Sequence, residues 1–577
     1  MQRFKSIILP MQGKSKDNLH WLYNDAYKPI SPEKEKIFSY CSLRFRFAGT
    51  NFRNSEKLLL FVEIPAAFVQ GISTNDSIPI ESYLLQILSP VINTLSKEYV
   101  NEAKGTREKA QFNAQNADER MLRRSGIHYD SEKNSVILTV HFSVPLVNAL
   151  SVNAKAAVRA VKDILEHIEN TVKSLDTDAI SSYVSCYRRQ EQIRSFLKAR
   201  DICAFVADGS ILPRENGTKE QMADAVPFYT PESLKTLIPL DDGTSITGMG
   251  IKSGVTVITG GGYSGKSTLL DAIESGIYNH IPGDGREYVI ADGSALKVYA
   301  EDGRPVSSLD LSPFFRHLPQ GKDVNCFSTL HASGSVSQAA NIIEAVCGGA
   351  GLLLIDEDKS ATNFMIRDRN MRKIVKNEPI IPFTDRVREL YTEKGVSTIL
   401  VIGGSSEYLP CADSVILMDD YRVKDIIAEV ADLGVPRGAA WPDRASWTDS
   451  RRLIPKQTAQ AFLYFHTVET ENEKKIILDD YSADITLLTS VRTGDQMNTL
   501  ACVMEQVLTD KEIDGDELIK KAADMTGSIF SGDGFESKSL LADTRFRWYG
   551  EIRPLDAFCC ANRMRGLSFK NVNKFRD

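Results

Sequence analysis

The sequence predicts an α/β protein whose central part is built around a mainly parallel β-sheet. Between residues 199 and 430, short and nearly all-apolar runs such as Val255–Thr259, Leu352–Ile355 and Thr398–Ile402 are separated by helical stretches. Such runs are typical of strands buried on both faces of a parallel sheet, because the connecting helices cover each face. The main sheet is therefore expected between 199 and 430.

The preceding segment, residues 1–198, is expected to be a mixed α/β domain. In Leu43–Phe47 the apolar residues alternate with Arg44 and Arg46, which predicts a strand with one buried face and one basic face. Val136–Val144 is a second extended run, and the chain after residue 154 has the apolar spacing of long helices.

The following segment, residues 431–577, is expected to be a mainly helical domain with a basic tail. One extended insert is expected near residues 475–488. The sequence thus divides into three predicted domains, 1–198, 199–430 and 431–577.

The composition excludes several classes of protein. The 577 residues include 69 Lys and Arg and 76 Asp and Glu, a net charge of -7, and 42% are hydrophobic, which excludes disordered, collagen-like and coiled-coil chains. No window holds the roughly 18–20 uninterrupted apolar residues of a membrane helix, so no membrane association is expected. The nine cysteines form no C-x-x-C pair, which argues against a disulfide framework or a zinc site.

The strongest motif is a glycine-rich loop that follows an apolar strand and opens a helix. The run from Gly260 to Ser267, GGGYSGKS, matches G-x-x-x-x-G-K-[ST] in full. Such a loop turns backbone N–H groups toward one point, where the helix dipole also favours an anion. The motif predicts ATP phosphates on the loop, with Lys266 reaching the β and γ phosphates. The predicted nucleotide ligands from the loop are Gly260, Gly262, Tyr263, Ser264, Gly265, Lys266, Ser267 and Thr268.

An acidic pair ends the apolar run Leu352–Ile355. Two adjacent carboxylates are costly to place there unless they act on a cation or a water molecule. Asp356 is therefore predicted to hold Mg²⁺ together with the Ser267 hydroxyl, and Glu357 to be the general base. The predicted catalytic residues are Glu357 and Lys266.

These motifs together resemble ABC-type ATPases. The stretch from Asp356 to Asn363, DEDKSATN, resembles a Walker B and D-loop segment, and the stretch from Ser333 to Gln338, SGSVSQ, resembles a degenerate signature loop. In that superfamily the signature loop of one subunit closes over the nucleotide of the other. The resemblance therefore implies an α/β ABC-type P-loop ATPase core, a homodimer, and nucleotide contacts in trans from Ser333, Gly334 and Ser335.

One departure from the superfamily pattern concerns the switch histidine. Its expected place after the next strand holds Gly403-Gly404-Ser405-Ser406. Water positioning or γ-phosphate sensing must then be done by another group, for which Ser405 is a polar candidate, and slow turnover is expected.

A closer resemblance covers about residues 205–424. Three sequence blocks, from Phe205 to Arg214, from Tyr278 to Glu287 and from Ala361 to Asp368, resemble the family of predicted ABC-class ATPases of bacteria and some protists. One member of that family is associated with a kinetoplastid mitochondrial RNA-processing complex that takes part in RNA editing. The resemblance implies RNA binding by a basic pore in the dimer and a mitochondrial location, with the cytoplasm as the alternative.

Three local basic clusters make RNA binding plausible in a net-acidic chain. A groove of cations follows a phosphate backbone with strong salt dependence and little base discrimination. In the second cluster, Arg120, Arg123 and Arg124 share one face if the segment is helical. Arginines that bridge domains explain each cluster equally well. The predicted RNA-binding residues are Arg44 and Arg46, then Arg120, Arg123 and Arg124, then Arg563, Arg565 and Lys570.

Two other functions compete with an RNA-remodelling ATPase. A non-catalytic assembly module that is gated by nucleotide fits the missing switch histidine. A DNA-directed ABC ATPase would need long coiled-coil insertions, which the sequence lacks. Turnover measured beside nucleotide-dependent dimerisation separates the first of these from an ATPase.

Overall fold

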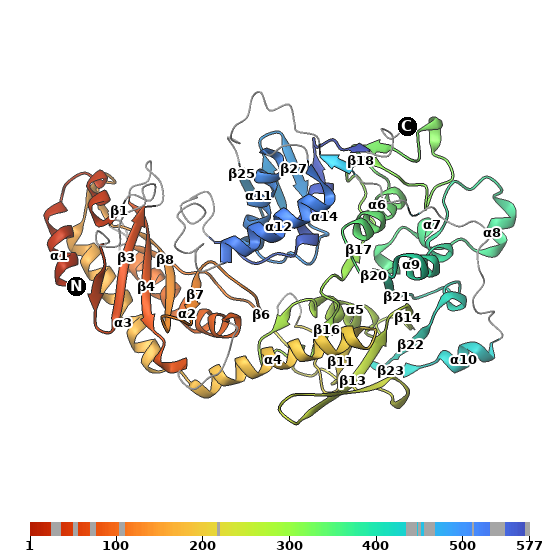
Figure 1. The fold of residues 1–577 in the computed structure, drawn as a ribbon, viewed down its shortest axis with the longest axis horizontal. Coiled ribbons are helices and arrows are strands. Elements are labelled where there is room, and N and C mark those ends of the chain that lie inside the picture. Colours follow the sequence, from red (N-terminus) through yellow and green to blue (C-terminus); the bar gives the residue numbers. More distant parts are fainter. Residues whose placement is uncertain are drawn as a thin grey trace. The chain divides into compact units, whose positions relative to one another are not determined.

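The computed structural model covers the chain in two compact units (Figure 1). Unit 1 comprises Met1–Tyr187 and Met525–Glu551, and unit 2 comprises Arg188–Asp524 and Ile552–Asp577. The chain passes between them three times, within the helices α4 (Thr177–Ala199) and α12 (Gly515–Phe530) and between Glu551 and Ile552. The structure describes all residues except 25–35, 50–55, 70–76, 103–109, 216–219, 434–446, 448–451, 455–467, 473, 510–512, 531–547 and 572–577.

Unit 1 is built on a mainly antiparallel sheet in the order β1-β3-β4-β8-β5, with β2 paired to β3 and β7 paired to β8. The predicted strands at 43–47 and 136–144 are confirmed as β3 and β8. The strands are β1 (Tyr23–Asn24), β2 (Phe38–Tyr40), β3 (Leu43–Gly49), β4 (Lys57–Pro65), β5 (Gln111–Asn113), β7 (Ile127–Asp130) and β8 (Ser135–Ser143).

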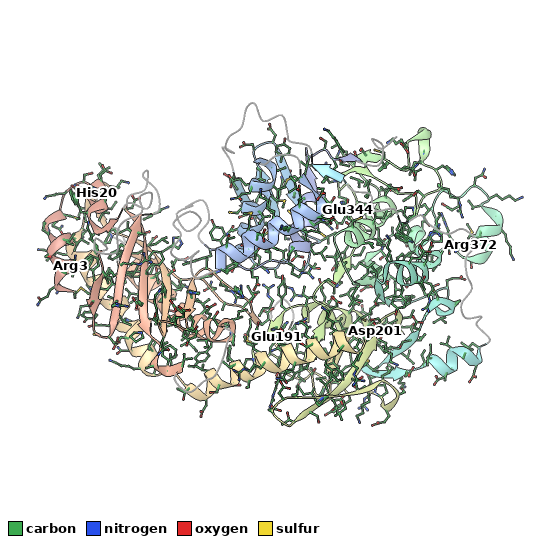
Figure 2. The ribbon with its side chains drawn as sticks, viewed as in Figure 1. Arg3, His20, Glu191, Asp201, Glu344 and Arg372 are labelled. Carbon is green, nitrogen blue, oxygen red and sulfur yellow. The ribbon has the colours of Figure 1, made fainter. Side chains whose placement is uncertain are left out.

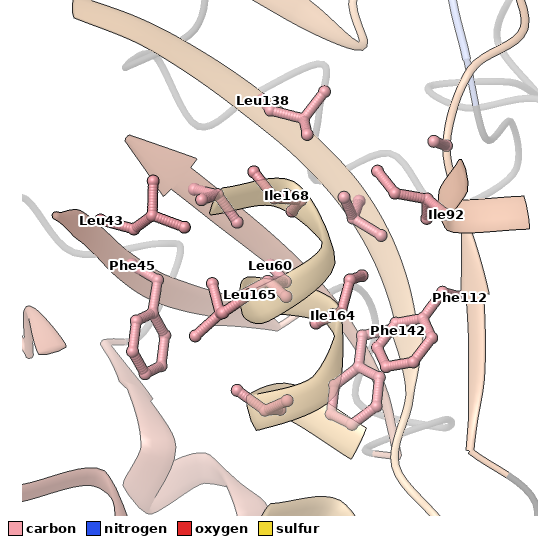
Figure 3. Close-up of a cluster of buried hydrophobic side chains, with 14 of the residues drawn as sticks. Leu43, Phe45, Leu60, Ile92, Phe112, Leu138, Phe142, Ile164, Leu165 and Ile168 are labelled. Carbon is pink, nitrogen blue, oxygen red and sulfur yellow. The ribbon is translucent and has the colours of Figure 1, made fainter. Parts of the chain in front are cut away.

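Helices cover this sheet and complete the core of unit 1. In α3 (Ala154–Lys173), apolar side chains recur at the three- and four-residue spacing of a helix, which places Ile164, Leu165 and Ile168 on one buried face. They pack with residues of β3, β4 and β8 such as Phe45 and Leu138 (Figure 3). The other helices of unit 1 are α1 (Gln2–Ile8) and α2 (Ile78–Glu102).

Unit 2 contains the predicted parallel sheet, in the order β17-β20-β21-β14-β22-β23. Five strands are parallel and only the edge strand β23 is antiparallel. Each of the three apolar runs predicted from the sequence is one of these strands. The strands are β14 (Val255–Gly260), β17 (Leu296–Val298), β20 (Leu352–Asp356), β21 (Ser397–Val401), β22 (Ser414–Asp419) and β23 (Arg422–Asp425).

A second, antiparallel sheet in unit 2 has the order β12-β13-β11-β16. Its strands are β11 (Ile202–Ala207), β12 (Lys235–Pro239), β13 (Ser245–Lys252) and β16 (Val289–Ala291). The helices of this part of unit 2 are α5 (Lys266–Ser275), α6 (Gly334–Cys347), α7 (Thr362–Met365), α8 (Arg369–Ile374), α9 (Val387–Lys394) and α10 (Ile427–Asp432).

The residues after 431 combine helices with two small sheets, so strands are more frequent there than the one extended insert predicted. One sheet has the order β25-β26-β27-β29 and the other β28-β24-β30. The helices besides α12 are α11 (Gly494–Thr509) and α14 (Pro554–Asn562). The strands are β24 (Arg452–Ile454), β25 (Val468–Glu471), β26 (Lys475–Leu478), β27 (Tyr481–Asp484), β28 (Ile513–Asp514), β29 (Met564–Arg565) and β30 (Lys570–Asn571).

The contact-based division also differs from the three predicted segments, because the chain after residue 430 contributes to both units. Most of it belongs to unit 2, where α14 contacts α6. Among the described helices, none is long and apolar enough to cross a membrane.

Candidate nucleotide site

The glycine-rich loop has the backbone conformation that its sequence requires. Gly260 and Gly265 have φ values of +146° and +96°, in a region that L side chains rarely adopt. A Cβ atom on Gly260 would also lie 2.2 Å from the carbonyl oxygen of Met418 in β22. Tyr263 has a φ of +59° and is 97% exposed. Its side chain therefore stands away from the protein at the tip of the loop.

Lys266 lies within this loop at the start of α5. Its Nζ donates hydrogen bonds to the carbonyl oxygens of Gly260, at 2.9 Å, and Gly261, at 2.6 Å. The ammonium group is therefore held among the loop residues predicted to surround the phosphates. The buried hydroxyl of Ser264 has no hydrogen-bond partner among the described residues, which leaves it available to a ligand.

The predicted metal ligands are adjacent in space although they are 89 positions apart in the chain. The Ser267 hydroxyl donates to Oδ2 of Asp356 at 2.8 Å, and Asp356 is only 3% exposed at the end of β20. A hydroxyl and a carboxylate oxygen are the hard ligands that Mg²⁺ prefers. The donor set therefore fits Mg²⁺.

The predicted general base contacts the loop that replaces the switch histidine. Oε2 of Glu357 accepts hydrogen bonds from the backbone N–H of Gly403 at 2.7 Å and of Gly404 at 3.4 Å. The Ser405 hydroxyl instead accepts from the backbone N–H of Glu407, at 3.2 Å. The sequence did not predict the contact of Glu357 with Gly403 and Gly404, because only side chains were considered as partners and the donors are backbone amides.

The predicted signature residues lie at the N-terminus of α6. Ser333 is the N-cap with an extended backbone and forms no side-chain cap. Gln338 connects this helix to the predicted D-loop: its amide donates to the Ser360 hydroxyl at 2.9 Å and accepts from the backbone N–H of Ala361 at 2.8 Å. Residues 333–335 form no hydrogen bond to the described residues of the glycine-rich loop within the same chain.

Three predicted RNA-binding residues are buried, which corrects their assignment. Arg120 and Arg124 are 0% and 2% exposed, and both pair with Asp118 at 2.5 Å. Residues 120–121 form the strand β6 (Arg120–Met121), not a helix, so no shared helical face exists. Arg563 is 5% exposed and pairs with Glu301 at 2.6 Å. These guanidinium groups are already paired inside the protein and do not face a polyanion.

The other predicted RNA-binding residues are more accessible. Arg123 and Lys570 are exposed. Arg44 is exposed and pairs with Glu63 across β3 and β4, while Arg46 lies over the Phe61 ring at 4.5 Å from its centroid. Arg565 donates to the carbonyl oxygens of Leu330, at 2.8 Å, and Gly303, at 2.6 Å.

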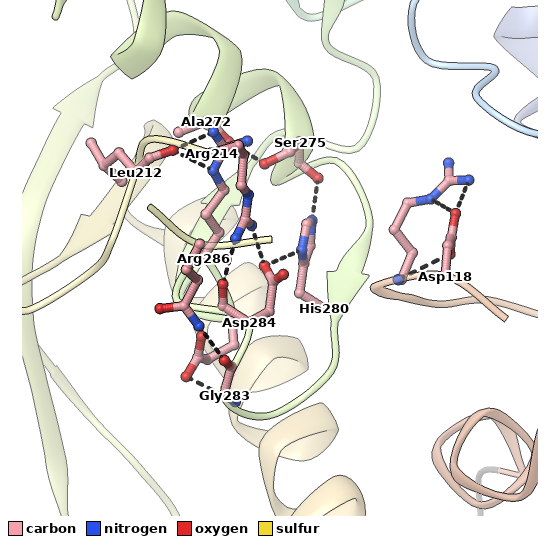
Figure 4. A network of polar contacts seen from close by, with 12 residues as sticks. Asp118, Leu212, Arg214, Ala272, Ser275, His280, Gly283, Asp284 and Arg286 are labelled. Atoms are coloured by element: carbon pink, nitrogen blue, oxygen red, sulfur yellow. Dashed lines mark hydrogen bonds and ion pairs between the residues drawn. The ribbon is translucent and has the colours of Figure 1, made fainter. Parts of the chain in front are cut away.

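A polar network joins the end of α5 to the turn that follows it (Figure 4). His280 is buried, and its two ring nitrogens lie 2.8 Å from Oδ2 of Asp284 and 3.1 Å from the carbonyl oxygen of Ser275. Arg214 pairs with the same carboxylate at 2.7 Å. Burial raises the pKa of Asp284, but the bonds from His280 and Arg214 outweigh it and lower that pKa below 3.8. His280 therefore has a structural role, with both ring nitrogens in contact with neighbouring residues.

Residues 176–444 match the family model ABC_ATPase, described as a P-loop domain, and this part of the chain is an ABC-class P-loop domain. An uncharacterized protein of Methanocaldococcus jannaschii, MJ1628, is 28% identical over 288 residues, which are 47% of this chain and 62% of that protein. The chain therefore spans less than two thirds of this relative.

Solved structures of ABC transporter proteins resemble the chain only in part. CbiO1 from Clostridium perfringens, part of the transporter complex cbiONQ, is 17% identical with a TM-score of 0.26, over 40% of this chain and 91% of cbiO1. An inward-facing ABC transporter of metal-chelate type is 16% identical with a TM-score of 0.25, over 39% of this chain and 82% of its own. TM-scores this low carry no argument about function.

Proposed function

We propose that the chain binds Mg-ATP at the loop between β14 and α5 and hydrolyses it. The observation that carries the proposal is the direct contact of Ser267 with Asp356, next to Glu357. The glycine-rich loop follows β14 and the acidic pair ends β20, so both lie at the carboxyl ends of the parallel strands, where ligands of open α/β sheets bind. An ABC-class P-loop domain supports the same reading.

Each residue has a distinct task in the proposed reaction. The amides of the glycine-rich loop and the α5 dipole bind the phosphates, and Lys266 leaves its carbonyl partners to contact the β and γ phosphates. Ser267 and Asp356 hold Mg²⁺, which offsets negative charge on the phosphates. Glu357 accepts a proton from the water that attacks the γ phosphorus, and the Gly403 and Gly404 amides orient its carboxylate.

A homodimer would complete this site. Residues 333–335 lie at the N-terminus of the 14-residue helix α6, where free amides and the helix dipole favour an anion. They have no hydrogen bond to the loop of their own chain, so a second copy is the partner that they fit. The proposal is that Ser333, Gly334 and Ser335 contact the γ phosphate held by the other subunit.

RNA binding is the finer part of the proposal, now limited to the accessible cations Arg44, Arg123, Arg565 and Lys570. Such scattered charges would bind a phosphate backbone with salt-sensitive affinity and little base preference. A role in RNA editing and a mitochondrial location are implied only by the resemblance to one member of the family, and the relative from Methanocaldococcus jannaschii is uncharacterized.

A non-catalytic assembly module is the second candidate. It is favoured by the hydrogen bonds from Gly403 and Gly404 to Glu357, which occupy one oxygen of the base. In this alternative ATP closes the dimer without turnover.

Three variants separate the candidates. Lys266→Ala is expected to abolish ATP binding in equilibrium titration, because it removes the phosphate-contacting ammonium. Glu357→Gln is expected to bind ATP, lose phosphate release and accumulate a dimer in light scattering. Lys252→Ala changes an exposed lysine of β13 and is the control. Unmodified protein that dimerises with ATP but releases no phosphate would support the assembly module, and an ATP-bound Glu357→Gln protein that stays monomeric would contradict the dimer.

A further inference from the structure

A pocket of about 440 Å³ lies in unit 2, outside the nucleotide site. Two segments form it and are joined by backbone hydrogen bonds: Arg316 N–H donates to the Pro379 carbonyl at 2.9 Å and Ile381 N–H to the Phe314 carbonyl at 2.8 Å. None of its lining residues belongs to the glycine-rich loop, to β20 or to the acidic pair. Its volume is within the range of about 300–1,000 Å³ typical of small-molecule sites.

The walls of the pocket are mainly basic. Four permanent cations face two carboxylates, a net charge of +2 with the histidine neutral. Among its basic residues, Arg316, His317 and Lys376 are exposed. The cations are Arg316, Arg367, Arg372 and Lys376, and the acids are Glu378 and Asp385.

Two ion pairs position Arg367 and Arg372 in the wall of the pocket. Arg372, on α8 (Figure 2), binds both oxygens of Asp385 at 2.7 Å. Arg367 pairs with Glu378, and its buried Nε has no hydrogen-bond partner among the described residues. Each buried unpaired donor in a folded protein needs an explanation, and a ligand in the pocket would supply an acceptor. The carboxylates thus hold two guanidinium groups in place while the net charge stays positive.

The pocket also has an apolar side that a bare inorganic anion would not use. Met371 and Val375 are 43% and 39% exposed, and Ile380 and Pro382 extend the same lining. An apolar surface beside clustered cations fits a ligand with an organic ring and a phosphate.

We propose that this pocket binds the phosphate of a nucleotide unit, either free or within single-stranded nucleic acid. Arg316 and Lys376 contact the phosphate, Arg367 donates from Nε, and Met371 and Val375 pack against the organic part. Arg367 also donates to Oδ1 of Asn363 at 3.2 Å, in the segment that follows Glu357. The polynucleotide form of the ligand rests on the proposed RNA binding, whereas the free form does not.

The test uses the full chain carrying Lys266→Ala, so that nucleotide on the glycine-rich loop does not contribute. Probes are uridine 5′-monophosphate, uridine, and an oligouridylate of about 12 nucleotides, a length within the site sizes of single-strand binders. The pocket variant is Arg316→Glu with Lys376→Glu, both exposed. The control is Lys373→Glu, which is exposed on α8, three positions before Lys376, but does not line the pocket. Circular dichroism confirms that each variant is folded.

The expected result is binding of a phosphate-bearing probe that the pocket variant weakens by at least about tenfold, the loss of one charged hydrogen bond, while the control changes little. If the pocket variant binds uridine 5′-monophosphate more weakly, the ligand is a free nucleotide. If it binds only the oligouridylate more weakly, the ligand is a nucleic acid. Equal binding of uridine and its monophosphate, equal binding by the pocket variant, or no binding of either phosphate probe would overturn the proposal. If the unmodified protein does not bind ATP, the proposed ATPase function is contradicted, but the proposal for this pocket is not.

Discussion

Replacing Asp118 by Asn should destabilise unit 1 strongly, because one carboxylate pairs with two buried guanidinium groups. Its Oδ2 accepts from Nε and an NH2 nitrogen of Arg120, at 2.9 and 2.5 Å, and its Oδ1 accepts from Arg124 at 2.5 Å. Asn keeps the shape of the side chain but removes the charge. Breaking a buried ion pair costs about 3–5 kcal/mol, because the remaining charge stays buried without compensation. That is a large part of the roughly 5–15 kcal/mol that stabilises a typical domain.

The measurement is urea unfolding followed by circular dichroism and by hydrogen exchange of unit 1 amides. With a urea slope of roughly 2 kcal/mol/M, the expected loss lowers the midpoint by about 2 M. Arg123→Ala is the matched control, since Arg123 lies between the two buried arginines but is exposed. An unchanged midpoint for Asp118→Asn would refute the structural role of Arg120 and Arg124 and reopen their assignment to RNA.

Three further predictions concern the buried charges and the thiols. Arg563→Met should lower the thermal midpoint, because it leaves Glu301 buried without its main partner, whereas Arg565→Met should change it little; equal midpoints in a calorimetric scan would contradict this. Burial raises the pKa of Glu301, but Arg563 and Arg304 outweigh burial and lower that pKa below 4.5. The free energy of unfolding that this shift contributes above pH 4.5 should therefore be lost as the pH drops below 4.5. In Arg563→Met this loss should be less steep. Burial raises the pKa of Cys203, Cys559 and Cys560 to about 12, so a thiol reagent at pH 8 should modify the exposed Cys41 first, as peptide mapping would show.

The sequence was sufficient to predict the parallel sheet, and the metal ligands that it predicts for the nucleotide site lie close together in the structure. Strands such as Leu352–Asp356 are buried on both faces and read as uninterrupted apolar runs, so their pattern is unambiguous. The contact between Ser267 and Asp356 could be expected as well, because the glycine-rich loop and the acidic pair each end a parallel strand at the same edge. The strands β14 and β20 are separated only by β21.

The basic clusters could not be assigned from sequence because charge does not reveal burial. The sequence does not distinguish Arg123 from Arg120 and Arg124, yet only Arg123 is exposed. Asp118, a few positions earlier in the chain, pairs with the other two. For Arg563 the partner, Glu301, is 262 positions away, and no local pattern connects them. The small sheets after residue 431 were missed for a related reason: strands of two to four residues are too short to establish a two-residue period.

Buried pairs of the same kind connect the C-terminal segment to the proposed ATP site. Arg304 donates to Glu344 in α6 at 2.6 Å and to the carbonyl oxygen of Asn562 at 3.1 Å, while Arg563 donates to Asn341 of α6 at 3.0 Å. The helix that begins at the predicted signature loop is therefore held by residues from the end of the chain. Because these charges are buried, the C-terminal segment cannot leave α6 without the cost of exposed or unpaired ions. Closure of the proposed dimer over ATP would thus move α6 and α14 together, and any ligand of the C-terminal segment would act on the γ-phosphate contacts through this helix.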